Sequence, residues 1–297
     1  MTLTEFDLLE LEYERPVPVV AEIDGIPMTG LLAEVPQPRA VLLALHGGQT
    51  TSRYFDCPGH PRLSLLRTAA RLGYTALALD RPGYGGSAAY PELLADPRRR
   101  MELMYAALEA VLGARPRGKG VFLLAHSAGC ELAVRMAADA RGPHLLGMEL
   151  GGSGAEANMA APLGSGRAGS VRHLVWHPEQ AYPPELVGGA AIGAPRPEHE
   201  GVAAHLRSRD EFPGLAAQVQ VPLHITVGEH EQVWRTDAEA LAEYTGMFSA
   251  APRVELEVLR DAGHNLSLGY SAAAYHLEVL AFAEECLTKV IGPPRER

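Results

Sequence analysis

Residues 121–129 read V-F-L-L-A-H-S-A-G and decide the fold. Five apolar residues lead into the polar pair His126 and Ser127, and a helical pattern begins directly afterwards. A buried strand that turns sharply into a helix around one serine is the layout of a nucleophile elbow. Small residues two positions before and after the serine keep the strand and the helix from colliding. These are Ala125 and Gly129, so the pattern is A-x-S-x-G, with one methyl group more than the usual G-x-S-x-G.

Strand and helix patterns alternate on both sides of this elbow. Short apolar runs bounded by turn residues predict further strands at 17–23, 28–35, 40–45, 75–80, 145–150, 221–227 and 254–259. Amphipathic runs predict helices at 61–72, 97–112, 130–140 and 270–287. The first two strands are joined by Asp24 and Gly25, a pair that favours a hairpin. The alternation predicts an α/β fold with a mostly parallel sheet of about eight strands and helices on both faces.

The carboxyl ends of parallel strands meet at one edge of the sheet, where such folds bind their ligands. The residues expected at this edge are His46, Asp80, Ser127 and Gly151, together with the turn after Val227. The sequence therefore predicts a reactive crevice beside the elbow serine.

Residues 153–214 break the alternation. Glycine, proline and histidine are frequent there, and no long strand or helix pattern is sustained. We therefore expect a lid or cap insertion in a core made of residues 1–152 and 215–297. No histidine pair at helix spacing has an acidic partner, so we expect no metal site. The residues expected to roof a substrate pocket are Trp176, His177 and Tyr182.

Composition narrows the function classes. The chain has 297 residues, 47% of them hydrophobic, which is ample for a buried core. Its net charge of −10 disfavours nucleic acid, whose binding needs a basic face. The acidic N-terminus lacks the layout of a signal peptide, and no apolar run reaches the ~18 residues of a membrane span. Three separated cysteines without a C-x-x-C pair fit free thiols in the cytoplasm. We expect a small-molecule substrate and leave the oligomeric state open, a homodimer included.

Two later loops hold the acid and the base that a serine nucleophile needs. A serine hydroxyl is a poor nucleophile at neutral pH, so it requires a nearby base that is itself oriented by a carboxylate. Residues 228–233 read G-E-H-E-Q-V, and residues 261–266 read D-A-G-H-N-L. The chain order Ser127, Glu231, His264 matches the Ser…Asp/Glu…His order of one fold class. Taken alone, Ser127 would also fit a helix N-cap.

The ordered set of motifs resembles the α/β-hydrolase superfamily. The matching stretches are H-G-G at 46–48, D-R-P-G-Y-G-G-S at 80–87, A-H-S-A-G at 125–129, G-E-H-E at 228–231 and A-G-H at 262–264. The resemblance implies the α/β-hydrolase fold with a lid insertion. It also implies that Ser127 is the nucleophile and His264 the general base.

The same resemblance assigns the remaining roles. The acid commonly sits three residues after the glycine of its loop, which selects Glu231 over Glu229. Asp261 is so close to His264 in the sequence that we expect it to shape the turn instead. The family's oxyanion hole implies the N–H groups of Gly48 and Ala128.

Three polar residues lie beside these donors in the sequence. His46 is expected to brace the loop. Gln49 is a candidate side-chain donor to the substrate, and His126 is either a substrate contact or a structural neighbour of the serine.

The leading hypothesis is a serine hydrolase without a cofactor that cleaves an ester, thioester or related carbonyl bond through an acyl-enzyme on Ser127. The alternative keeps the triad and changes the reaction to acyl transfer, elimination or ring closure in secondary-metabolite biosynthesis. A non-catalytic binding protein on the same fold is the remote alternative.

Overall fold

One mixed sheet forms the centre of the molecule. The computed structural model describes residues 15–158, 171–200 and 210–288. The eight strands of its sheet lie in the order β1-β2-β4-β3-β5-β6-β7-β8. They are β1 (Val17–Ile23), β2 (Ile26–Ala33), β3 (Val41–Leu45), β4 (Thr75–Leu79), β5 (Val121–His126), β6 (Leu145–Gly151), β7 (Leu223–Gly228) and β8 (Val254–Leu259). The predicted fold class is confirmed.

The sheet is mostly parallel, with antiparallel pairing at one end. The strands β4, β3, β5, β6, β7 and β8 all run parallel to one another. β2 is antiparallel to both of its neighbours, β1 and β4. The β1–β2 hairpin turns through Asp24 and Gly25, which have φ angles of 51° and 78°. Positive φ at both central residues is what the tight hairpin turn requires and what an Asp-Gly pair tolerates.

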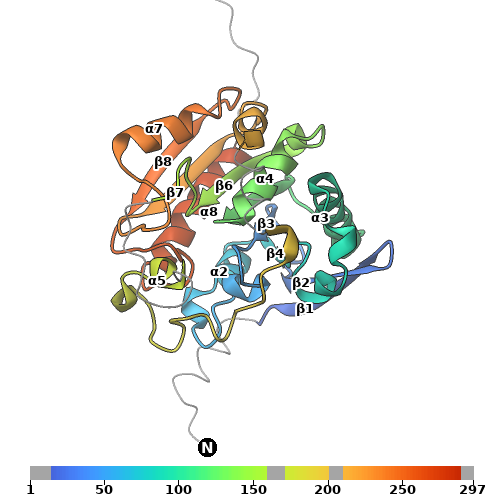
Figure 1. Ribbon diagram of the computed structural model, residues 1–297. Coiled ribbons are helices and arrows are strands. Elements are labelled where there is room, and N and C mark those ends of the chain that lie inside the picture. Colours follow the sequence, from blue (N-terminus) through green and yellow to red (C-terminus); the bar gives the residue numbers. More distant parts are fainter. Residues whose placement is uncertain (1–14, 159–170, 201–209, 289–297) are drawn as a thin grey trace, which may run out of the picture.

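Helices cover both faces of the sheet (Figure 1). The helices labelled there are α2 (Leu65–Arg71), α3 (Pro97–Leu112), α4 (Gly129–Ala138), α5 (Val171–Val175), α7 (Ala238–Gly246) and α8 (Ala272–Leu287). Residues 210–216 are helical as well. α3 and α4 share one hydrophobic cluster with the sheet, and α2 and α8 share the other. The helix expected at 61–72 begins later, because the Ser64 side chain accepts the N–H of Arg67 and so caps α2. α7 was not predicted.

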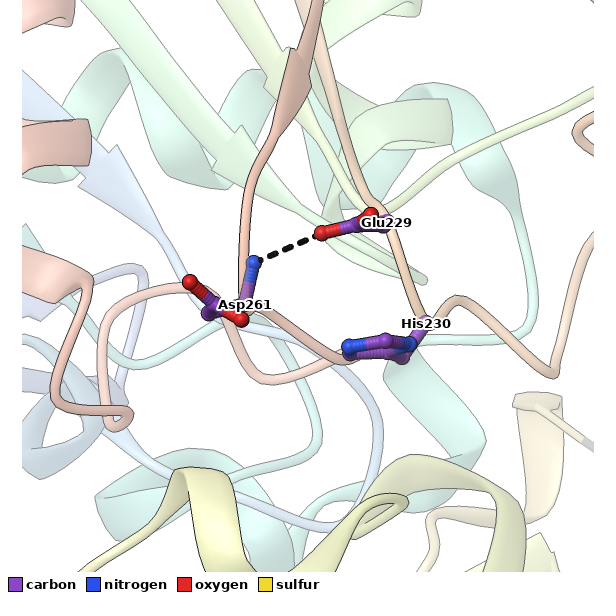
Figure 2. Close-up of side chains that lie close together, drawn as sticks. All are labelled: Glu229, His230 and Asp261. Carbon is purple, nitrogen blue, oxygen red and sulfur yellow. Dashed lines mark hydrogen bonds between the residues drawn. The ribbon is translucent and has the colours of Figure 1, made fainter.

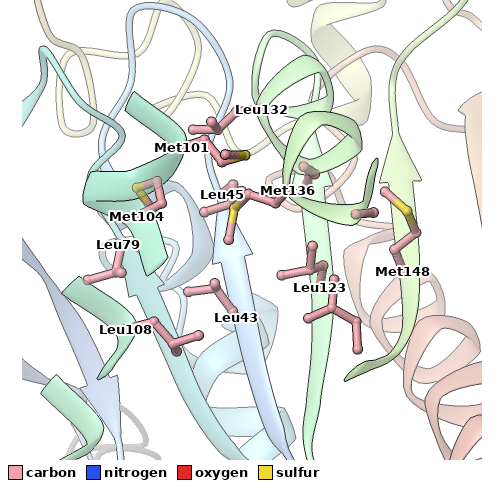
Figure 3. Packing of buried hydrophobic residues seen from close by; sticks show 14 of the residues in the cluster. Leu43, Leu45, Leu79, Met101, Met104, Leu108, Leu123, Leu132, Met136 and Met148 are labelled. Atoms are coloured by element: carbon pink, nitrogen blue, oxygen red, sulfur yellow. The ribbon is translucent and has the colours of Figure 1, made fainter. Parts of the chain in front are cut away.

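Alternating residues of each central strand fill the two clusters. All five residues of β3 are buried. Leu43 and Leu45 face α3 and α4. Figure 3 shows Leu45 beside Met136 of α4 and Leu43 near Leu108 of α3. Leu42 and Ala44 point to the opposite face, toward α2 and α8. A strand buried on both faces has a continuous run of apolar residues, and for this reason β3 and β5 could be predicted from the sequence.

The described parts of residues 153–214 contain α5, two short 3-10 turns at Glu179–Ala181 and Glu198–Glu200, and a helical stretch that continues from 210 to 216. Trp176 in this segment is 5% exposed and belongs to the same cluster as α2 and α8. The division of the chain into a core and a separate lid stays a prediction. No helix of the described ranges has the length and apolar character to span a membrane.

Candidate active site

The elbow between β5 and α4 holds Ser127 in an uncommon conformation. Its φ is 51°, in the left-handed region that residues with a Cβ rarely adopt. Such a residue stores strain on the order of 1–3 kcal/mol and persists only where its surroundings fix it. Here the N–H of Ser127 donates to the carbonyl of Gly151 and its carbonyl accepts from Cys130, both at 2.9 Å. The elbow is therefore tied to β6 on one side and to α4 on the other.

Close packing at the elbow explains its small residues. A Cβ on Gly129 would lie 2.6 Å from the carbonyl oxygens of both Leu45 and His46, so this position accepts only glycine. Ala125 is fully buried at the other flanking position, where the structure accommodates its methyl group. The departure from the usual glycine leaves the turn intact.

Ser127, His264 and Glu231 form one hydrogen-bonded line. The Nε2 atom of His264 lies 2.9 Å from the Oγ of Ser127, and its Nδ1 atom lies 2.7 Å from the Oε2 of Glu231. The side chains of His264 and Glu231 are 2% and 0% exposed. The second oxygen of Glu231 accepts the N–H of Val233 at 2.6 Å. The carboxylate is thus fixed before any ligand binds.

Glu229, the other candidate acid, points elsewhere. Its Oε2 accepts the backbone N–H of Asp261 at 3.0 Å, and its side chain is exposed (Figure 2). Asp261 has φ 52°, so it shapes the turn that precedes His264. With His230, the two carboxylates form a group whose ligand atoms lie within 4.8 Å of one another. Both carboxylates are exposed, and one oxygen is already engaged by a backbone N–H.

Two backbone N–H groups beside Ser127 lack an acceptor in the described part of the chain. They belong to Gly48, in the loop after β3, and to Ala128. A Cβ on Gly48 would lie 3.7 Å from that of Ala128, so the two residues are neighbours. The N–H of Gln49, by contrast, donates to the Tyr84 hydroxyl at 2.9 Å. The loop therefore leaves the Gly48 N–H available and engages the next one.

His46 and Arg81 brace this loop. The backbone N–H of Arg81 donates to Nε2 of His46 at 3.0 Å, and its Nε donates to the His46 carbonyl at 2.6 Å. Another guanidinium nitrogen donates to the carbonyl of Gly47 at 3.0 Å. Burial, together with the charge of Arg81, lowers the pKa of His46 well below its usual value. A neutral His46 that accepts a hydrogen bond fits the bracing role expected from the sequence.

A cavity of about 780 Å³ opens in front of Ser127. Of the expected substrate contacts, Gln49, His126 and Trp176 line it. His177 and Tyr182 are not among the lining residues. The Tyr182 hydroxyl instead accepts the N–H of Asn265 at 3.2 Å, next to His264.

His126 supports the base from the other side. Its Nε2 lies 2.8 Å from the carbonyl oxygen of His264, to which it donates. Its ring stacks on Tyr54 at a centroid distance of 4.5 Å. Burial and the neighbouring His264 lower the pKa of His126 well below its usual value. The residue is thus placed both to line the cavity and to hold the histidine loop.

Trp234 was missed by sequence reasoning. It lines the cavity, and its indole Nε1 donates to the carbonyl of Gly152 at 2.9 Å. Its backbone N–H also points to Glu231 at 3.4 Å. The one available signal was its position three residues after the candidate acid.

Comparisons with known proteins bear on the family and the fold of the chain. The model of the Alpha/beta hydrolase family matches residues 41–275. No curated protein matches the chain in sequence. A soluble variant of monoglyceride lipase from Saccharomyces cerevisiae is 12% identical with a TM-score of 0.73, over 93% of this chain and 96% of that one. A carboxyl esterase from Bacillus coagulans is 15% identical with a TM-score of 0.66, over 93% and 100%. A thioesterase domain from the curacin biosynthetic pathway is 18% identical with a TM-score of 0.61, over 90% and 100%. At these identities the likeness to solved structures shows a shared fold.

Proposed function

Because the chain belongs to the alpha/beta hydrolase family, we propose that it is a serine hydrolase that cleaves an ester, thioester or related carbonyl bond of a small molecule. The observation that carries this proposal is the line from Ser127 through His264 to Glu231, with hydrogen-bond distances of 2.9 and 2.7 Å. A nucleophile, a base and an orienting carboxylate in this relation can perform acyl transfer without a cofactor.

In the first step, the Oγ of Ser127 attacks the substrate carbonyl while Nε2 of His264 takes its proton. The carboxylate of Glu231 accepts the Nδ1–H of His264 and stabilises the imidazolium that forms. The N–H groups of Gly48 and Ala128 donate to the oxyanion of the tetrahedral intermediate. Each such donor is worth a factor of about 10²–10³ in rate.

The imidazolium then protonates the leaving alcohol or thiol, and an acyl ester on Ser127 remains. In the second step, His264 takes a proton from water, whose oxygen attacks the acyl carbon. Collapse of the second intermediate returns the proton to Ser127 and releases the carboxylic acid. Water balances the reaction, so no other co-reactant is needed.

Covalent labelling tests the proposal directly. A fluorophosphonate should label the wild type once, and Ser127→Ala should not be labelled. Ser153 lies in the same cavity, so Ser153→Ala is the matched control and should keep the label. Mass spectrometry of the labelled peptide identifies the residue. Labelling of Ser127→Ala at the wild-type rate would overturn the proposed nucleophile.

Product analysis then separates hydrolysis from the alternative reactions of the same triad. With an activated acyl ester in water, the expected product is the free acid. An acyl ester of an added alcohol that dominates in dilute aqueous solution would indicate acyl transfer instead.

A further inference from the structure

The cavity in front of Ser127 has a charge pattern that the proposed reaction does not use. Among the residues that the structure describes, five arginines and three glutamates line it, although the whole chain carries a net charge of −10. Arg81 braces the loop after β3, and the proposed acyl transfer uses none of the other four arginines. The proposed reaction therefore does not explain why these arginines line the cavity.

All three glutamates are paired with arginines. Glu200 lies 2.5 Å from a terminal nitrogen of Arg81. Glu131 and Glu211 both contact Arg135, at 2.7 and 2.8 Å. These contacts compensate each carboxylate that lines the cavity within the described ranges. The negative side chains therefore cannot attract a cationic substrate without first losing an arginine.

The other three arginines, Arg100, Arg172 and Arg196, have no carboxylate partner in the part of the chain that the structure describes. Arg172 and Arg196 are exposed, whereas Arg100 is partly buried on the first turn of α3. One terminal nitrogen of Arg100 donates to the carbonyls of Leu94 and Ala95, at 2.7 and 3.1 Å. This contact anchors the guanidinium and leaves its other nitrogens without an acceptor among the described residues.

The pKa of Arg100 shifts in the opposite direction to the pKa values of Arg81 and Arg135. Burial lowers the pKa of Arg100, even though Glu131 and Glu200 are near enough to oppose it. Burial acts on Arg81 and Arg135 as well, but the carboxylates beside them outweigh it and raise their pKa values. Arg100 is thus a partly desolvated cation that has no direct carboxylate partner among the described residues. Such a group is costly on its own and is stabilised when an anion binds.

We propose that this cavity binds substrates that carry a carboxylate or phosphate group in addition to the scissile carbonyl, and that Arg100 binds this anion. The inference rests on the proposed serine-hydrolase function, because it names the substrate class of the same site. Glu200 lies near both the oxyanion-hole loop and Arg100. Its carboxylate lies 3.6 Å from the position of a Cβ on Gly48, and its charge also acts on Arg100. Arg172 and Arg196 would add a long-range attraction for anions.

Binding without turnover separates this inference from the proposed reaction. Ser127→Ala would be titrated calorimetrically with mono(4-nitrophenyl) glutarate and with 4-nitrophenyl pentanoate, which has the same number of acyl carbons and no charge. A charge-assisted hydrogen bond predicts about tenfold tighter binding of the anionic ester. Equal affinity for the two esters would overturn the inference, whether or not Ser127 is the nucleophile. Loss of fluorophosphonate labelling specificity would instead overturn the proposed function.

Substitution then tests the residue. In the Ser127→Ala background, Arg100→Gln should bring the two affinities within about twofold of each other. Arg98 is exposed two positions earlier and does not line the cavity, so Arg98→Gln removes the same charge and should keep the tenfold ratio. A ratio that survives in Arg100→Gln would overturn the assignment. Thermal unfolding verifies that each variant is folded.

A salt series needs no variant at Arg100. The affinity ratio should fall as NaCl is raised from ~10 mM to 1 M, because salt screens the attraction between the anionic ester and the guanidinium of Arg100. A ratio unchanged by salt would contradict charge recognition. Competition by glutarate and by inorganic phosphate distinguishes a carboxylate from a phosphate as the favoured group. Competition by neither anion at concentrations up to ~100 times the ester's Kd would count against the inference.

Discussion

Two buried histidine–glutamate pairs make the same contact at different places relative to the sheet. His264 and Glu231 come from the loops after β8 and β7, with Nδ1 and Oε2 2.7 Å apart. His224 and Glu149 lie within β7 and β6, with the same two atom types 2.5 Å apart. Both carboxylates are fully buried. The chemistry of the contact therefore does not distinguish a reactive pair from a structural one.

What distinguishes the two pairs is the third side chain that each one contacts. Nε2 of His264 faces the Oγ of Ser127, whereas the free oxygen of Glu149 accepts the hydroxyl of Tyr275 from α8 at 3.1 Å. Glu149 and His224 are direct neighbours across the parallel β6–β7 ladder, so they lie under the crevice rather than at its edge. A pair at the end of two strands can reach a ligand, and a pair within the strands bridges the sheet to a helix.

The largest effect expected from this comparison is the loss of activity in Glu231→Gln. An amide cannot stabilise the imidazolium or hold the same histidine tautomer, so kcat should fall by about 10³–10⁴. Stability should change little, because Gln keeps the volume. Steady-state hydrolysis of a 4-nitrophenyl ester provides the measurement. Glu229→Gln, on the same loop, is the control and should stay within twofold of the wild type.

A retained kcat in Glu231→Gln would mean that the carboxylate only supports the loop. An equally large loss in Glu229→Gln would mean that the loop as a whole, and not one carboxylate, sustains activity.

The second effect concerns stability. Glu149→Ala removes the partner of both His224 and Tyr275 inside the protein, so the free energy of unfolding should fall by about 3–5 kcal/mol. Urea unfolding gives this value, and kcat of the folded fraction should stay within a few-fold of the wild type. Glu22→Ala, an exposed glutamate on β1, is the control and should change stability by less than about 0.5 kcal/mol. A loss of kcat without a loss of stability would place Glu149 in the reaction.

Much of the fold could be predicted, because its central strands are buried on both faces. β3 and β5 read as continuous apolar runs, and α3 was predicted with the bounds that the structure shows. The amphipathic face of α3 packs on the sheet and the Asp96 side chain caps its N-terminus, so local and tertiary signals agree. α2 was predicted too long, because a capping serine inside an apolar pattern is a weak signal.

The line of Ser127, Glu231 and His264 could be proposed because each residue follows a strand whose position was readable. The ion pair of Arg81 with Glu200 could not, because the sequence between them does not show which loops meet. The pair of Glu149 and His224 was missed for a different reason. An apolar run that contains a single polar residue predicts a strand without showing what that residue faces.

The third prediction uses pH to sharpen the comparison. Burial opposes the charged form of His224, but the hydrogen bond and charge of Glu149 raise its pKa above the usual value of about 6.5. A raised pKa means that the pair contributes its full stability below pH ~6.5 and loses it as the pH rises through the folded-state value. The free energy of unfolding lost in His224→Gln should therefore be larger at pH 6 than at pH 9. Urea unfolding of both proteins at the two pH values measures this difference. A loss that grows with pH would show that the histidine is neutral in the pair.

The smallest effects come from removing one hydroxyl beside each pair. Tyr275→Phe leaves an oxygen of Glu149 without its donor, so the free energy of unfolding should fall by about 1–2 kcal/mol, with kcat unchanged. Tyr182→Phe removes the acceptor for the N–H of Asn265, which directly follows His264 in the chain. A small displacement of His264 should lower kcat about two- to tenfold, since catalysis is sensitive to sub-ångström placement. Urea unfolding and steady-state kinetics on both variants measure the two effects together. If each hydroxyl changed only stability, position relative to the strand ends would no longer explain which pair is reactive.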